Sequence, residues 1–156
     1  MPTTKKKPKT IKLTLQIATR CAALPSALEF KGWVDHALLG RTTFTELTIR
    51  LIGYRESAYL NETFRHKMGP TNILSFVFEP PPGISSPLLG DLAICAPLVH
   101  REAKQQGKTN TAHWAHLVIH GCLHLIGYDH QTAVDASKME TLEIKLLEEL
   151  GYENPY

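Results

Sequence analysis

Three histidines between residues 120 and 130 have the residue type and the spacing of metal ligands. His120 and His124 are four residues apart, so on a helix they lie one turn apart on the same face, within reach of one ion. Gly127 follows where a left-handed residue often ends a helix, and the chain can then bring His130 back toward the pair. Three nitrogen ligands with an open fourth position are typical of catalytic zinc. The sequence therefore predicts one divalent metal ion per chain, with zinc expected, bound by His120, His124 and His130.

The same segment nearly matches a protease signature. The metzincin pattern is H-E-x-x-H-x-x-G-x-x-H, and every fixed position is present here except the glutamate, which Gly121 replaces. That glutamate is the general base that takes a proton from the metal-bound water during peptide hydrolysis. Without it, we expect a substrate with a better leaving group than an amine, or a substrate that supplies its own nucleophile.

Further side chains could act together with the metal. Arg65 presents paired guanidinium donors that match a phosphate, although an exposed helix position or an ion pair is the commoner role for such a residue. His113 and His116 precede His120 on about the same helical face; either could contact a ligand or carry a proton, but packing at the helix surface is favoured. Asp129 could orient a ligand imidazole, replace the missing protease base, or fix the turn.

Apolar periodicity and turn residues predict the elements that must position these groups. A capping box formed by Ser26 and Glu29 predicts a helix that buries Leu28, Val34 and Leu38. The other expected helices span residues 57–67, 98–106 and 133–150, and the expected strands span 11–17, 47–51, 72–78 and 91–95. Strands and helices therefore intermix around a small sheet.

The helix that carries His120 and His124 is expected to begin near residue 110, with Asn110 or Thr111 as its cap. Apolar residues surround this helix almost completely, which predicts a central and buried position. Residues 80–87 are rich in proline and could form a mobile rim over a site.

Length and charge indicate one domain after a basic tail. The 156 residues are enough for a single core. We expect residues 1–10 to be a solvated, disordered tail and residues 11–156 to form one catalytic metal-binding domain. Residues 1–128 hold 15 Lys and Arg against 8 Asp and Glu, whereas residues 129–156 hold 2 against 7. This asymmetry is compatible with a polyanionic partner on one side of the molecule.

The cysteines and the hydropathy indicate the compartment. Three cysteines without a C-x-x-C pair suggest free thiols in a reducing environment, and Cys122 points away from the helical histidines, so packing is its expected role. No apolar stretch approaches the roughly 18 residues needed to cross a membrane, and no signal-peptide core follows the basic residues. We expect a cytoplasmic protein without a membrane partner.

The block from His120 to His130 resembles the defining motif of the YbeY family, the metal-dependent endoribonucleases of bacterial ribosomal RNA maturation. The likeness continues upstream and covers most of the chain after the tail. The segments that carry it are Leu60-Asn61 with Phe64-Arg65, Thr71-Asn72-Ile73-Leu74-Ser75-Phe76, and Gly90-Asp91-Leu92-Ala93-Ile94.

The resemblance implies an α+β fold in which a small, mixed, four-stranded sheet packs with about five helices. It implies zinc on His120, His124 and His130, and Arg65 as the catalytic or phosphate-holding arginine. The implied substrate is single-stranded RNA, the implied role is 3′-end processing of small-subunit ribosomal RNA with ribosome quality control, and the implied partner is the ribosome or a ribosomal protein. Asn72 stands where the family usually has aspartate. If that carboxylate serves catalysis, activity is reduced here; if it only caps a strand, asparagine serves equally well.

Two alternatives remain open from the sequence. One is a zincin-like metallohydrolase that acts on another bond, including a peptide bond. The other is a non-catalytic, metal-stabilised domain that binds ribosomal RNA or a ribosomal protein, although structural zinc is normally closed by four protein ligands. Three imidazoles also suit nickel, copper or iron.

Overall fold

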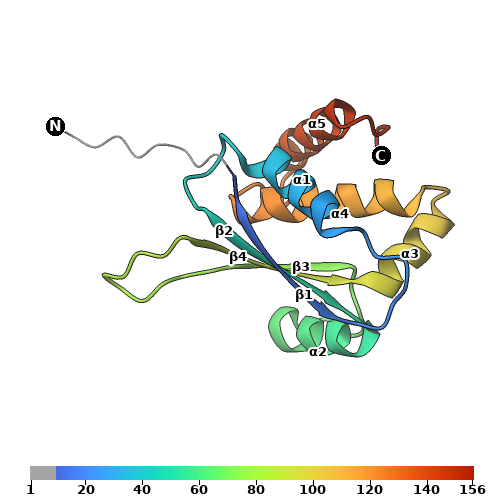
Figure 1. Cartoon of the computed structure of the whole chain (residues 1–156), viewed down its shortest axis with the longest axis horizontal. Coiled ribbons are helices and arrows are strands. Elements are labelled where there is room, and N and C mark those ends of the chain that lie inside the picture. The colour runs from blue at the N-terminus through green and yellow to red at the C-terminus, as the bar shows by residue number, and fades with distance from the viewer. Residues whose placement is uncertain (1–9) are drawn as a thin grey trace.

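The computed structural model of the chain describes residues 10–156, and at its centre lies a four-stranded sheet with helices on both faces (Figure 1). The strands are β1 (Lys12–Ala18), β2 (Glu46–Ile52), β3 (Ile73–Val77) and β4 (Leu88–Cys95). Their order is β1-β2-β4-β3, with β1, β2 and β4 parallel and β3 antiparallel to β4. The sheet is therefore mixed and β3 is an edge strand. The helices are α1 (Ala27–Leu38), α2 (Tyr54–Arg65), α3 (Ala96–Gln105), α4 (Asn110–Leu125) and α5 (Ala133–Glu149).

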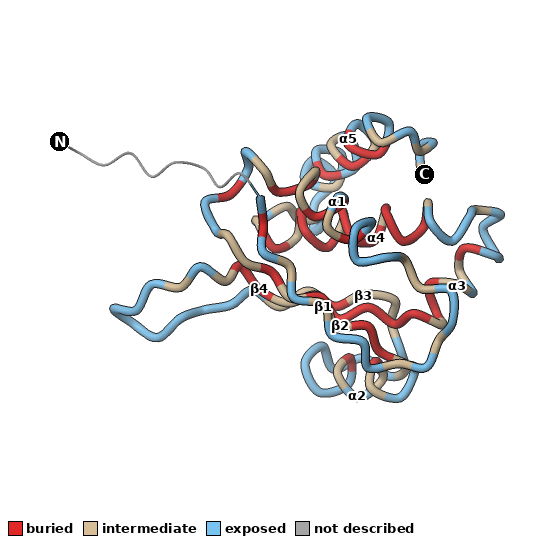
Figure 2. Tube along the Cα trace, in the orientation of Figure 1, coloured by how far each residue is buried: buried red, intermediate tan, exposed pale blue. Residues whose placement is uncertain are grey.

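These elements confirm the α+β class with four strands and five helices. Helices α1, α4 and α5 lie over one face of the sheet and α2 lies over the other (Figure 1). The main core fills the space between the sheet and the α1–α4–α5 layer, as the buried segments in Figure 2 show. A smaller apolar cluster lies on the opposite face, under α2. Its buried members are Ile52, Leu74, Ala93, Cys95 and Leu98.

The predicted capping box opens α1. Ser26 Oγ accepts from the Glu29 backbone N–H at 3.1 Å, and Glu29 Oε1 accepts from the Ser26 N–H at 3.0 Å. Val34 and Leu38 are buried as expected, but the prediction for Leu28 is wrong, because its side chain is 83% exposed. The buried stripe also holds residues 30, 33 and 37, and position 28 is about half a turn round the helix from its centre.

Helix α4 is central and buried, as the sequence predicts. It contacts the other layers from both sides: β3 and β4 of the sheet, and helices α1, α3 and α5. Its cap differs from the expectation, because Thr109, rather than Asn110 or Thr111, is the N-cap residue. Thr109 Oγ1 accepts from the Ala112 backbone N–H at 3.1 Å and so satisfies one of the free donors of the first turn.

The described part of the chain also bears on the remaining domain-level expectations. No helix within residues 10–156 is long and apolar enough to cross a membrane. Except for Thr10, the predicted basic tail lies outside the described residues. Residues 78–87 form the long connection between β3 and β4, which projects from the end of the sheet (Figure 1).

Candidate metal centre

The three predicted ligands come together at the end of α4. One nitrogen from each of His120, His124 and His130 lies within 4.8 Å of the others. The ring centroids of His120 and His124 are 4.7 Å apart, and those of His124 and His130 are 5.0 Å apart. A cluster of imidazole nitrogens this close is suited to a single divalent transition-metal ion.

The turn after α4 brings His130 to the pair. Gly127 has φ +104°, a conformation that side chains rarely adopt. The Tyr128 N–H donates to Leu123 O at 3.0 Å and the Gly127 N–H donates to His124 O at 3.0 Å, which is the Schellman pattern of helix ends. Asp129 Oδ1 then accepts from the His130 backbone N–H at 2.7 Å. Three roles were considered for Asp129, and this contact matches the last of them, which is to fix the turn.

A buried carboxylate that the sequence analysis missed orients this cluster. Glu143 of α5 is 0% exposed. It accepts from His120 Nδ1 through Oε1, and from His116 Nε2 at 3.1 Å and the Tyr156 hydroxyl through Oε2. Burial alone raises the pKa of Glu143, but the three donors together lower it to about 2. Because Glu143 is ionised, His120 must donate through Nδ1, and its Nε2 is left as the nitrogen that can bind a metal.

The two other histidines of α4 have partners of their own. His116 contacts Glu143 and packs beside the His120 ring at 6.1 Å, so it supports a ligand instead of only packing at the helix surface. His113 is buried, and its Nε2 lies 3.0 Å from Glu102 Oε1. Cys122 is fully buried and belongs to neither group of possible metal ligands among the described residues, in agreement with the expected packing role.

Arg65 lies in the same cavity as the three histidines. It is the last residue of α2, and its Nη2 donates to Ser75 O at 2.7 Å on the free edge of β3. Its guanidinium also lies over the Phe76 ring, 5.0 Å from the centroid. Arg65 and the histidines line a cavity of about 420 Å³. The structure therefore brings together all four predicted site residues, which the sequence spacing could not do for Arg65.

Asn72 stands at the start of β3 and lines the same cavity. Its Oδ1 accepts from the Ile73 backbone N–H at 2.7 Å, so it caps the strand. Its Nδ2 donates to Glu102 Oε1 at 3.1 Å, a bond that an ionised aspartate at this position would lack. Asn72 therefore caps β3 and also pairs with Glu102, whose carboxylate contacts His113.

Gly121, where the protease signature has its glutamate, packs tightly against the sheet. A Cβ added here would lie 2.6 Å from Ile73 Cδ1 and 2.9 Å from Leu92 Cδ2. Both atoms are the ends of flexible side chains, so a larger residue at position 121 requires Ile73 and Leu92 to move aside.

The donor set fits a metal ion better than a proton-sharing cluster. Burial, followed by the neighbouring His120 and His130, lowers the pKa of His124, which keeps its imidazole neutral and available as a ligand. A second group, His116, His120 and Glu143, is equally close, but its atoms are already hydrogen-bonded to one another. The site at His120, His124 and His130 is therefore the better candidate.

The chain is similar to known proteins in sequence and in fold. A family model described as Endoribonuclease YbeY matches residues 16–151. Among solved structures, the chain is similar to the solution structure of TM1509 from Thermotoga maritima, with 20% sequence identity and a TM-score of 0.56, over 88% of this chain and 92% of that chain. At this identity the structural likeness concerns the fold.

Proposed function

The chain belongs to the Endoribonuclease YbeY family, and on this premise we propose that it is a metal-dependent endoribonuclease specific for single-stranded RNA. Its role in this proposal is the 3′-end processing of small-subunit ribosomal RNA and ribosome quality control, with the ribosome or a ribosomal protein as partner, in the cytoplasm. The metal is one divalent ion per chain, with zinc expected from the three imidazoles.

One observation carries the proposal: a single cavity holds a cation suited to phosphate together with a cluster suited to a metal. Arg65, His120, His124 and His130 all line it. Lys67 is a second cation that lines this cavity. The cluster alone would fit many metallohydrolases, and the added cations favour a phosphodiester substrate.

The roles of the side chains follow from this arrangement. An ion bound by the three histidines supplies Lewis-acid chemistry, which polarises a phosphate oxygen or acidifies a water molecule. Glu143 holds His120 in the required tautomer. Arg65, fixed to β3 through one nitrogen, offers its remaining donors to the non-bridging phosphate oxygens, where negative charge grows in the transition state.

The nucleophile is either water or the 2′-hydroxyl of the RNA. The end groups of the products distinguish these routes. A 5′-phosphate on the downstream product excludes the internal route, whereas a 2′,3′-cyclic phosphate on the upstream product excludes direct attack by water.

The test is cleavage of a single-stranded RNA that spans the 3′ end of small-subunit ribosomal RNA. Wild type is compared with His124→Ala, which removes a ligand, and with Arg65→Ala. Arg55→Ala is the matched control, because Arg55 is an exposed arginine of α2 that does not line the cavity. We expect cutting by wild type and Arg55→Ala, and a loss of at least about 100-fold in the other two variants while their circular dichroism is unchanged.

Three results would contradict the proposal. Equal cutting by all four proteins would indicate a contaminating nuclease. An absence of cutting by every protein, with tight RNA binding retained, would favour the non-catalytic domain that the sequence left open. Chelator-sensitive cleavage of a protein substrate instead would favour the metallohydrolase alternative.

A further inference from the structure

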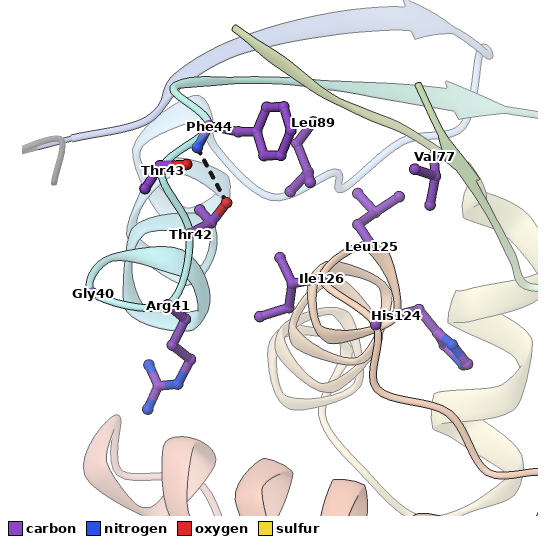
Figure 3. A pocket seen from close by; sticks show the side chains of 11 residues that line it. Gly40, Arg41, Thr42, Thr43, Phe44, Val77, Leu89, His124, Leu125 and Ile126 are labelled. Atoms are coloured by element: carbon purple, nitrogen blue, oxygen red, sulfur yellow. Dashed lines mark hydrogen bonds between the residues drawn. The ribbon is translucent and has the colours of Figure 1, made fainter. Parts of the chain in front are cut away.

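A second cavity shares one lining residue, His124, with the metal cavity, although the His124 imidazole points away from the second hollow (Figure 3). Its volume is about 600 Å³. Three parts of the chain form its walls: the connection between α1 and β2, the last residue of β3 with the start of β4, and the end of α4. His124 lines both this cavity and the one that holds Arg65. Figure 3 shows the hollow between Phe44 and Thr42 on one side and Leu125 and Ile126 on the other.

The walls of this cavity, which we call the Phe44 cavity, are mainly apolar. Phe44 is 39% exposed and Val77 is 57% exposed, so part of each side chain is open to solvent. Leu89, Leu125 and Ile126 complete the apolar lining. No Asp or Glu is among the described residues that line it, so a polyanion meets no repulsive charge there.

The loop that carries Phe44 is held in place. Thr42 Oγ1 accepts from the Phe44 backbone N–H at 3.2 Å, the bond drawn in Figure 3. Arg41 extends away from the hollow (Figure 3), and its Nη1 donates to His36 O at 3.4 Å at the end of α1. The aromatic ring is therefore presented by a fixed turn.

The free edge of β3 connects the two cavities. Ser75 lines the metal cavity and Val77 lines the Phe44 cavity. Alternate residues of a strand lie on the same side, about 6.6 Å apart, which is of the order of one nucleotide step in an extended strand. An RNA chain that follows this edge with one phosphate at Arg65 therefore brings a neighbouring base to Val77, on the wall of the Phe44 cavity.

We infer that the Phe44 cavity binds the base of the nucleotide next to the phosphate that is cut, with the Phe44 ring stacking on that base. This inference rests on the proposed function and adds the second point at which the substrate is held. Proteins that bind single-stranded RNA commonly stack bases on aromatic side chains. Stacking on the Phe44 ring accepts any base, because every base has an aromatic face.

The test maps where the base lies. A set of single-stranded hexaribonucleotides, each with 4-thiouridine at one position, is irradiated with the metal-loaded wild-type protein on ice. The protein is then digested with trypsin and analysed by mass spectrometry. Cleavage after Arg41 and Arg50 releases residues 42–50, which contain Phe44. We expect one position of the thiouridine to give a cross-link in this peptide. Cross-links that map only to other peptides would overturn the inference.

The second measurement compares variants by their Kd for a fluorescein-labelled, 2′-O-methylated oligonucleotide. Electrophoresis verifies that the oligonucleotide stays intact. Phe44→Ala should raise the Kd about tenfold, the size typical of one lost base stack. Phe44→Trp should restore it, because the larger ring still stacks. Leu28→Ala, which changes an exposed leucine outside both cavities, should leave it unchanged. An unchanged Kd in Phe44→Ala would overturn the inference.

The two proposals fail separately. A protein that cuts RNA but gives no cross-link in residues 42–50 keeps the nuclease proposal and loses the base site. The apolar cavity would then serve another occupant, such as a protein partner. A protein that cross-links there but cuts no RNA keeps the base site and loses the nuclease proposal.

Discussion

Glu143 orients a predicted ligand of the metal centre, although it binds no metal itself in our proposal. It joins His120, His116 and Tyr156 in one buried group. The orientation of His120 therefore depends on α5 and on the segment after it, and not only on the helix that carries the histidine.

Replacing Glu143 by Gln should weaken metal binding by about 10- to 100-fold, the usual effect of losing an outer partner of a ligand. The amide keeps the size of the side chain but removes the negative charge that fixes the His120 tautomer. Competition with a chromophoric chelator measures the Kd for zinc. Tyr156→Phe should act in the same direction with less risk to folding, and Glu148→Gln, an exposed acid on the same helix, is the matched control. Equal Kd values in all four proteins would contradict the role given to Glu143.

His113 should make the protein sensitive to mild acid. Burial, opposed in part by Glu102, lowers the pKa of this imidazole in the folded protein. Its contribution to stability is complete above the pKa of the unfolded imidazole, about 6.5, and is lost as the pH falls from there through the folded pKa. Urea unfolding between pH 7 and 5, with chelator present in every sample, should show a smaller loss of stability in His113→Gln than in wild type. An identical pH dependence would show that other groups are responsible.

At the scale of residues, the sequence predicts those parts of the site whose residues are close together along the chain. The three ligands lie within 11 positions, and a helical spacing followed by a glycine is enough to bring them together. Glu143 is 23 residues from His120, so only the packing of α5 on α4 reveals it. A signal was nevertheless present, because Glu143 follows Met139 by one helical turn on the apolar stripe of α5, where an acid needs a buried partner.

The pairing of β3 with β4 is the element-level feature on which both cavities depend, because β3 carries Ser75 and Val77. Gly90 of β4 pairs with Val77. A Cβ at Gly90 would lie 2.2 Å from Phe76 O and 3.0 Å from Leu125 Cδ2. Since the first of these atoms belongs to the backbone, only a glycine allows the two strands and the end of α4 to approach this closely.

Gly90→Ala should therefore lower the free energy of unfolding by about 1 to 3 kcal/mol, the range found for overpacked positions. Gly32→Ala is the matched control, because a Cβ there meets no atom within 4 Å. In the middle of α1 it should stabilise the protein by up to about 1 kcal/mol through helix propensity. Chemical denaturation followed by circular dichroism gives both values. A Gly90→Ala variant as stable as wild type would mean that β3 can move aside freely.

At the scale of elements, the pattern of apolar residues predicts every helix and strand found within residues 10–156, but their ends and some faces depend on contacts that the pattern does not contain. The cap of α4 is Thr109, one position before Asn110 and two before Thr111, the candidates chosen from sequence. Leu28 is apolar like the buried residues of α1, but it lies outside the stripe that they form. Both errors concern positions where several residues of similar propensity compete and tertiary packing decides.

For the whole molecule, the charge asymmetry of the sequence corresponds to a division in space. The acidic segment after residue 128 includes α5, which lies over the face of the sheet opposite α2 (Figure 1). Arg65 and Lys67, at the end of α2 and just after it, line the metal cavity. RNA should therefore approach from the side of α2 and the edge of β3, away from the acidic helix.

Metal binding should stabilise the whole fold, because the site joins α4 to the turn that follows it and, through Glu143, to α5. At a free zinc concentration 100 times the Kd, the gain is about 2.7 kcal/mol. For a protein of this size, this raises the melting temperature by about 5 to 10 °C. Scanning calorimetry with zinc and with chelator measures the shift. His124→Ala should lose most of the shift and Arg65→Ala should keep it; a full shift in His124→Ala would place the metal elsewhere.

The tight contact of Gly121 with Ile73 and Leu92 also bears on how such a chain can change during evolution. On paper, one substitution separates its histidine motif from that of a peptidase. In the folded protein, that substitution places a charged side chain against Ile73 and Leu92 at the interface between helix and sheet, and these two side chains must move to admit it. A lineage that moved between the two chemistries would therefore gain from smaller residues opposite the glycine. Two aliphatic side chains outside the histidine motif thus influence which residues the motif can accept.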